Sequence, residues 1–211
     1  MDLSENSSHA IASGTTKYEA EQYNTKGAIN LTGGYFDTYM EEHRNQKVTM
    51  FFVYDKKDRR LNTWNSLFHV YSTDHHFWLM DNFYDSVNDL GYYTPSLGWK
   101  KIAVGSDLNI VTVRSNDSTG TIYINGDSKV EEIYVKPNLH DGVSFSKDHK
   151  TRIGRGLAQN SDDNYDSDAS VSEILIFYDE LTLEETYKIN HYLAKKWGLT
   201  ASVDSDGDGF I

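Results

Sequence analysis

The sequence contains no cysteine and only two prolines among its 211 residues. Without cysteine there are no thiolate metal sites, no thiol catalysis and no disulfide framework. Two prolines leave few rigid linkers inside the chain. No apolar run approaches the roughly 18 residues that a membrane-spanning helix requires, and the opening residues, MDLSENSSHAIASG, contain no apolar signal region. We therefore interpret residues 1–17 as a loose polar linker.

Positive charge is also scarce, because 20 lysines and arginines stand against 32 aspartates and glutamates, for a formal net charge of −12. Such a balance repels phosphate backbones and anionic lipids, so nucleic acid and membrane surfaces are poor partners. Divalent cations are better partners, provided that the carboxylates cluster in the fold.

Apolar residues make up 38% of the chain and aromatic residues 13%. A chain of this length and composition can bury one core as a single domain and is not a disordered segment. From Tyr18 on, short runs of β-branched and aromatic residues recur with turn signals between them, which is typical of an all-β sandwich. The predicted strands are residues 47–54, 66–71, 77–80, 100–104, 109–114, 121–124, 132–136, 151–153 and 171–178.

Two local patterns predict a hairpin and a helix. Asn125 and Gly126 follow the run TIYI and favour a tight turn, because both residue types accept positive φ angles. Thr182 and Glu185 form a capping box at the start of one amphipathic helix, and Gly198 is placed to end it in the left-handed conformation. The apolar stripe of this helix predicts that it packs against the sandwich.

Residues 168–200, DASVSEILIFYDELTLEETYKINHYLAKKWGLT, place a strand directly before this helix. The order of strand, capping box and closing Trp-Gly resembles the last segment of laminin-G-like, concanavalin-A-like jelly rolls in bacterial surface and secreted proteins. The run 47–54, the hairpin 109–126 and the TRIG segment 151–154 extend the resemblance over nearly all of residues 18–200. The resemblance implies a two-sheet antiparallel jelly-roll sandwich with one C-terminal helix packed on it.

The densest group of polar residues is the segment 160–168, NSDDNYDSD. Ca²⁺ takes about six to eight oxygen ligands, whereas zinc would need the His and Cys that are missing nearby. Carboxylates this close repel one another without a cation, so we predict a Ca²⁺ site here, with a solvated acidic loop as the alternative. The segment lies between two predicted strands, at an end of the sandwich where ligand-binding loops are usual, and Tyr165 is a candidate ligand contact. The predicted metal ligands are Asp162, Asp163, Asn164, Asp166 and Asp168.

A second acid-rich and aromatic stretch covers residues 81–93, DNFYDSVNDLGYY. Its carboxylates complete another Ca²⁺ site or share cations with the first segment, and its rings offer contact area for recognition. The alternative is a turn-rich loop whose rings pack inward. The candidate metal ligands are Asp81, Asp85 and Asp89, and the candidate ligand-binding residues are Asn82, Tyr84, Asn88, Tyr92 and Tyr93.

Three smaller patterns carry less weight. The run GGYFD at residues 33–37 is a weaker candidate of the same kind. His75 and His76 are adjacent, and adjacent residues of a strand face opposite ways, so they are poorly placed to share a metal ion. Arg152 and Arg155 flank Gly154 and either hold a ligand carboxylate through a bidentate fork or neutralise nearby aspartates. Of the two, Arg155 is our candidate ligand-binding residue.

Residues 204–211, DSDGDGFI, match the first half of an EF-hand-type Ca²⁺ loop and stop before its closing carboxylate. We interpret residues 201–211 as the truncated start of an Asp-rich Ca²⁺-binding repeat.

Catalytic patterns are missing. Concanavalin-like glycosidases use two carboxylates on one face of a strand, and here Glu173 stands alone in its predicted strand. The chain has neither a Ser/His/Asp signature nor a phosphate-binding glycine loop. We therefore predict a binding module and not an enzyme.

The laminin-G-like frame, the acid-rich loops with tyrosines and the Asp-rich tail together resemble ligand-binding domains of large bacterial RTX-type adhesins. The resemblance implies an extracellular cell-surface module that uses Ca²⁺ to capture a C-terminal peptide of a partner cell's surface protein, flanked by other modules of its parent chain. A chain without cysteine fits this setting, although it also fits the cytosol. Two alternatives stay open: a Ca²⁺-dependent lectin that binds a glycan, and a structural spacer that Ca²⁺ stiffens.

Overall fold

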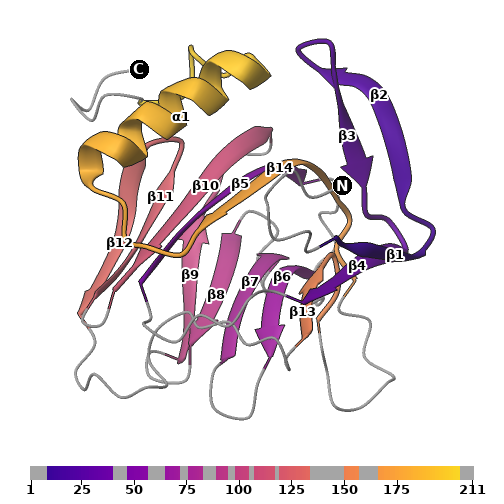
Figure 1. Ribbon diagram of the computed structural model, residues 1–211, viewed down its shortest axis with the longest axis horizontal. Coiled ribbons are helices and arrows are strands. Elements are labelled where there is room, and N and C mark those ends of the chain that lie inside the picture. Colours follow the sequence, from indigo (N-terminus) through magenta and orange to yellow (C-terminus); the bar gives the residue numbers. More distant parts are fainter. Residues whose placement is uncertain are drawn as a thin grey trace.

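The computed structural model describes residues 9–39, 47–56, 65–71, 76–82, 89–94, 98–104, 107–116, 119–133, 150–156 and 166–204. These residues form two seven-stranded antiparallel sheets with one helix on the outer side (Figure 1). The predicted all-β sandwich with a C-terminal helix is therefore confirmed. No helix in the described residues is long and apolar enough to cross a membrane.

We name the two sheets A and B. Sheet A has the strand order β1-β4-β13-β6-β7-β8-β9. Its strands are β1 (Ile11–Gly14), β4 (Gly34–Tyr39), β6 (Asn65–Tyr71), β7 (His76–Asn82), β8 (Asp89–Thr94), β9 (Gly98–Ala103) and β13 (Lys150–Ile153). Sheet B has the order β12-β11-β10-β5-β14-β3-β2. Its strands are β2 (Lys17–Tyr23), β3 (Lys26–Asn30), β5 (Val48–Lys56), β10 (Leu108–Ser115), β11 (Thr119–Ile124), β12 (Asp127–Ile133) and β14 (Ala169–Phe177).

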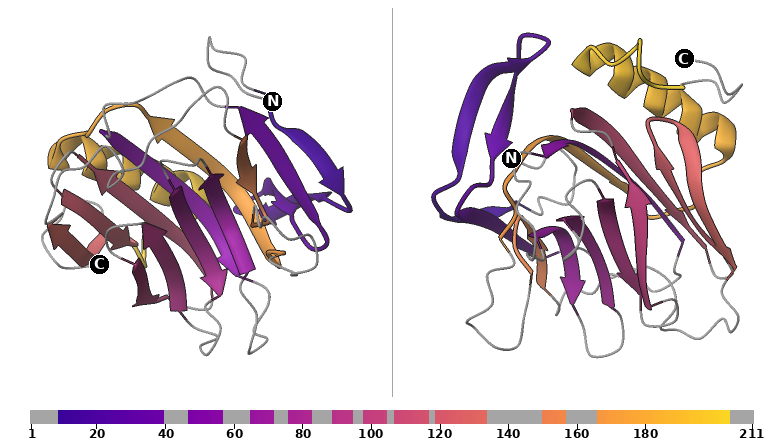
Figure 2. Two further views of the ribbon diagram at one scale, coloured as in Figure 1. Left: turned by 90° about the horizontal axis from the view of Figure 1, so that it is seen from below. Right: turned by 180° about the vertical axis from the view of Figure 1, so that it is seen from behind.

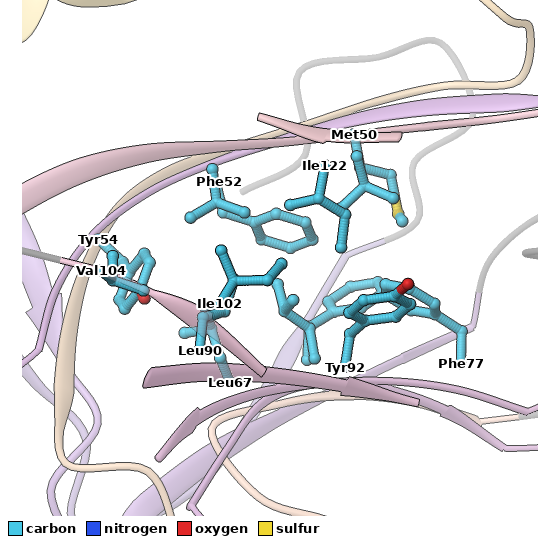
Figure 3. Close-up of a cluster of buried hydrophobic side chains, with 14 of the residues drawn as sticks. Met50, Phe52, Tyr54, Leu67, Phe77, Leu90, Tyr92, Ile102, Val104 and Ile122 are labelled. Atoms are coloured by element: carbon cyan, nitrogen blue, oxygen red, sulfur yellow. The ribbon is translucent and has the colours of Figure 1, made fainter. Parts of the chain in front are cut away.

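The main core lies between the two sheets (Figure 3). Phe52 of β5 and Phe68 of β6 meet across it, with ring centroids 5.1 Å apart. Every residue of β5 is buried, because one face of this strand lines the core and the other lies under the helix. Its sequence therefore reads as a continuous apolar run, without the alternation of a half-exposed strand.

A second apolar cluster joins sheet B to the helix α1 (Leu183–Trp197), which lies over the outer face of that sheet (Figure 2). Leu193 and Trp197 are buried there against Phe51 of β5. Glu173 of β14 accepts hydrogen bonds from the Trp197 indole nitrogen at 2.7 Å and from the Lys196 ammonium at 2.8 Å. Both carboxylate oxygens of Glu173 are thus engaged in fastening the helix to the sheet.

The predicted ends of the helix and the predicted hairpin turn are confirmed. The Thr182 hydroxyl accepts from the Glu185 amide at 3.2 Å, and the Glu185 carboxylate accepts from the Thr182 amide at 2.9 Å. Gly198 follows the helix with a left-handed φ of 76°. Asn125 and Gly126 join β11 to β12 with φ angles of 53° and 86°, as a tight turn between twisted strands requires.

After the helix, the chain crosses this turn. Val203 is buried in the second cluster, and the Asp204 amide donates to the Asn125 carbonyl at 2.9 Å. A Cβ atom on Gly126 would lie 1.6 Å from the Asp204 carbonyl oxygen, so only glycine leaves room for the crossing chain. Asp204, the first residue of the run that resembles half of an EF-hand-type loop, is thus packed on the domain, and residues 205–211 lie outside the described part.

The structure differs from the prediction in several strands. Ile11–Gly14, expected to be loose, form β1 and pair with β4. Asp89–Thr94, expected in a loop, form β8 between β7 and β9. Both strands are short and contain glycine, so they offer little alternation of apolar and polar residues for a pattern to detect.

Candidate ligand-binding site on sheet A

The strand register brings the two acid-rich stretches to one end of sheet A. At this end β6 begins with Asn65, which pairs with Asn82 at the end of β7, and β8 begins with Asp89. On the other side of β6, Asp166 forms a bridge with Ser66. One strand therefore separates the two stretches, and neighbouring strands lie about 4.8 Å apart, so the two backbones are about 10 Å from each other.

Several predicted site residues lie outside the described part of the chain. They are Asp162, Asp163, Asn164 and Tyr165 of the first stretch and Tyr84, Asp85 and Asn88 of the second. Among the residues that are described, no three His, Asp or Glu side chains are grouped closely enough to hold a metal ion. The Ca²⁺ site stays a prediction.

Two carboxylates of the first stretch are described, and both have protein partners. Asp166 accepts a bidentate pair of hydrogen bonds from Arg155, through Nε and through Nη2, the latter at 2.7 Å. This contact is the main reason why the pKa of the Arg155 guanidinium is raised above its ordinary value. Asp168 accepts from the Thr32 hydroxyl. For Asp166 the structure shows the neutralising arginine that the sequence left as an alternative.

A second bidentate pair lies beside the first. Arg152 of β13 donates through Nε and Nη2 to the two oxygens of Asp37 on β4, at 2.7 and 3.1 Å. The guanidinium carbons of Arg152 and Arg155 lie 4.2 and 4.6 Å from the centre of the Tyr35 ring. Two cations therefore lie against one aromatic ring, and the two aspartates balance their charge.

Gly154 explains how both arginines reach the same ring. Residues three apart in a regular strand point to opposite faces of the sheet. Gly154 has a φ of +93°, and a Cβ atom there would lie 3.1 Å from the Gly34 carbonyl oxygen. This glycine ends β13 and turns the chain, so Arg155 lies on the same side of the sheet as Arg152.

The outer face of sheet A continues from Arg152 through two cross-strand partners, His69 and Trp78. The backbone of Trp78 pairs in turn with that of Tyr93 on β8. The rings of His69 and Trp78 stack at 4.6 Å, and the Trp78 indole nitrogen donates to the Ser66 hydroxyl at 2.7 Å. Trp78 is only 9% exposed, so this stack is a structural contact in the fold and not an open platform.

Tyr92 lies on the opposite face of the sheet from Trp78. Its ring points between the sheets, is 4% exposed, and belongs to the main core (Figure 3). The reason is the alternation along β8, because Tyr92 pairs with the core residue Leu79. For this residue the structure has the inward packing that the sequence left as the alternative to ligand contact. Asp81 and Asn82 form the end of β7.

Local sequence patterns give only a weak indication of the residues around Tyr35. Tyr35 and Asp37 belong to the run GGYFD, a weak candidate, and Arg152 was one of two arginines with an open role. The signal that joins them is Gly154 between the arginines, but only the strand order β4-β13-β6 brings them to Tyr35. We call Tyr35, Asp37, Lys150, Arg152, Arg155 and Asp166 the arginine cluster.

Two antiparallel sheets packed face to face, with a helix over one of them, place the chain in the class of jelly-roll sandwiches. No family model matches the sequence, and no curated protein matches it either.

Solved structures similar to this one include receptor-binding parts of botulinum neurotoxins. The serotype G binding domain has a TM-score of 0.62 at 12% identity over 92% of this chain and 50% of its own. The neurotoxin DC binding domain in complex with SialylT has 0.64 at 14% over 92% and 48%. The same domain in complex with rat synaptotagmin II has 0.63 at 12% over 88% and 47%. This chain spans about half the length of those domains, and at such identities the likeness shows the fold alone.

Proposed function

We propose that this chain is a non-catalytic, Ca²⁺-dependent ligand-binding module of an extracellular bacterial surface adhesin. Its proposed ligand is a peptide, a C-terminal segment of a partner cell's surface protein. The proposal depends on one observation: the described residues of the two acid-rich stretches lie at the same end of sheet A, with a single strand between them. They are far apart in the sequence, and the strand order brings their described residues together.

Ca²⁺ would remove the electrostatic cost of this arrangement. Carboxylates at such spacing repel each other, and a hard cation accepts oxygens from flexible segments at about 2.3–2.6 Å. Because both oxygens of Asp166 are bonded to Arg155, the proposed metal ligands are the remaining candidate oxygen ligands of the two stretches. They are Asp162, Asp163, Asn164 and Asp168 from the first stretch and Asp81, Asp85 and Asp89 from the second.

The comparisons support a binding role in general terms. The similar solved domains are described as binding domains, and one was solved with a protein, rat synaptotagmin II. A glycan is the second candidate ligand, because another of these domains was solved with SialylT. Either ligand would be bound at this end of sheet A, where the described residues of the two stretches lie.

The test starts with thermal melts in millimolar Ca²⁺ and in EGTA. Ca²⁺ is expected to raise the melting temperature of the unchanged protein, and Asp162→Asn with Asp163→Asn is expected to abolish that rise. The matched control is Asp127→Asn with Glu184→Gln, which removes the same charge from exposed positions on sheet B and the helix. An equal Ca²⁺ response in all three proteins would place the site elsewhere.

Peptide and glycan arrays, each probed with and without Ca²⁺, then test ligand binding. Ca²⁺-dependent capture of peptides with free C-termini would support the first proposal, and capture of glycans would support the second. Ca²⁺ stabilisation without any captured ligand would support a structural spacer and contradict both.

A further inference from the structure

The arginine cluster has hydrogen-bond donors that the described part of the protein leaves unused. Arg152 and Arg155 each bind an aspartate through Nε and Nη2. A guanidinium has five N–H groups, and this side-on contact uses two of them. In the part of the chain that the structure describes, Nη1 of neither arginine has a hydrogen-bond partner. The fork formed by Nη1 and the second hydrogen of Nη2 is therefore open on both side chains.

These forks are held in position before any ligand arrives. Each guanidinium is fixed on one edge by a bidentate carboxylate and on one face by the Tyr35 ring. A long side chain that is already ordered loses less conformational freedom on binding. Arg155 is the more accessible of the two, since 35% of its side chain is exposed against 14% for Arg152.

The charge of the cluster points to an anion. Three cations, Lys150, Arg152 and Arg155, face two carboxylates, Asp37 and Asp166, which leaves a local charge of +1 on a chain whose net charge is −12. The Lys150 Nζ atom lies 3.3 Å from Asp37 Oδ2, and 38% of the Lys150 side chain is exposed. A planar carboxylate with one negative charge matches an open guanidinium fork, whereas a more highly charged phosphate is repelled more strongly by the acidic protein around it.

We propose that Arg155, supported by Arg152 on the Tyr35 ring, binds a carboxylate group of the module's ligand. This inference rests on the proposed ligand-binding function and names the chemical group that the site recognises. The carboxylate has two possible sources, the C-terminus of a peptide or an acidic sugar such as N-acetylneuraminic acid. Asp37 and Asp166 act as positioning residues, because each accepts hydrogen bonds from Nε and Nη2 of its arginine and leaves the opposite edge of the guanidinium group open.

The first experiment compares ligands that differ only in this group. Peptides with a free C-terminus are paired with their C-terminal amides, and glycans ending in N-acetylneuraminic acid are paired with the methyl esters. Blocking the carboxylate of the true ligand is expected to weaken binding by about 10- to 100-fold, the usual value of a charge-assisted contact. The class that shows the loss identifies the source of the carboxylate.

Variants of the arginine give the second test. Arg155→Lys keeps the ion pair with Asp166 but removes the planar fork, so it should lose the preference for free carboxylates while its melting temperature stays near that of the unchanged protein. Lys129→Gln is the control, because it removes one exposed charge from β12 on the other sheet. Equal binding of free and blocked ligands, with no effect of Arg155→Lys, would overturn the inference and leave the proposed function standing.

A third measurement keeps the inference testable if no array captures a ligand. Sodium acetate and N-acetylneuraminic acid are titrated against the protein while the side-chain N–H signals of its arginines are followed by NMR. The signals of Arg152 and Arg155 are expected to shift. Those of Arg114 serve as an internal control, because its Nε, Nη1 and Nη2 already bond to Leu181, Tyr123 and Glu180. Shifts equal to those of Arg114, or none, would refute the carboxylate site.

Discussion

Replacing Gly126 by alanine tests whether the segment after the helix, Val203 and Asp204, packs against the β11–β12 turn as the structure shows. The new Cβ atom would lie 1.6 Å from the Asp204 carbonyl oxygen, far inside van der Waals contact, so the tail has to move off the turn. The residue would also hold a left-handed φ of 86°, which costs an ordinary side chain about 1–2 kcal/mol.

The displaced tail adds two further losses. The hydrogen bond from the Asp204 amide to the Asn125 carbonyl is worth about 1 kcal/mol. Val203, 3% exposed, would return to water at about 1.5–3 kcal/mol. The free energy of unfolding should therefore fall by about 4–6 kcal/mol in the full chain.

Urea unfolding, followed by tryptophan fluorescence, measures this loss in two backgrounds. In a chain that ends at Ser202 there is no tail to displace, so Gly126→Ala should cost only the backbone strain of about 1–2 kcal/mol. A chain that ends at Asp204 keeps the contact and should show the full effect. The same loss in both shortened chains would refute the claim that the tail, and not the turn alone, requires glycine.

Two more predictions concern the helix cap and the outer face of sheet A. The pKa of Glu185 is lowered below its ordinary value by hydrogen bonds from the Thr182 hydroxyl and amide, so its contribution to stability is present above that ordinary value and is lost as the pH falls through the lower folded-state pKa. Glu185→Gln should weaken the acid dependence of helix melting, measured by circular dichroism. Ser66→Ala leaves the buried Trp78 indole N–H without its acceptor and should cost about 1–3 kcal/mol in urea unfolding, while Ser66→Thr, which keeps a hydroxyl, should cost less.

The parts of the fold that sequence predicted are those with a strong local cause. The capping box at Thr182, the left-handed Gly198 and the Asn125-Gly126 turn each depend on a few neighbouring residues, and all three are confirmed. β5 and β14 were found because long apolar runs need burial. β1 was not predicted from the sequence. Its strand conformation depends on pairing with β4, some twenty residues later in the chain, and not on its own composition.

The candidate site was harder to predict, because it is assembled across strands. Acidic clusters are visible in the sequence, but their common position follows from the order β13-β6-β7-β8, which local patterns do not contain. The sequence offers neutralisation of nearby aspartates as one role for the arginines, but it does not single out Asp166 as the partner of Arg155. The meeting of Arg152 and Arg155 on Tyr35 was not foreseen, because strand alternation would have separated the two arginines without the turn at Gly154.

The described chain begins at one edge of the sandwich and ends at the other, with β1 on one side and Asp204 over the β11–β12 turn on the opposite side (Figure 1). A pulling force applied through Ile11 and Asp204 would act across the strands, along the hydrogen bonds between them. Under such a force the hydrogen bonds between strands break one after another. The four residue pairs of β1 with β4 would separate first. Peeling β1 away would leave β4, which carries Tyr35 and Asp37, as the edge of sheet A. Mechanical tension would thus reach the arginine cluster before it reached the core.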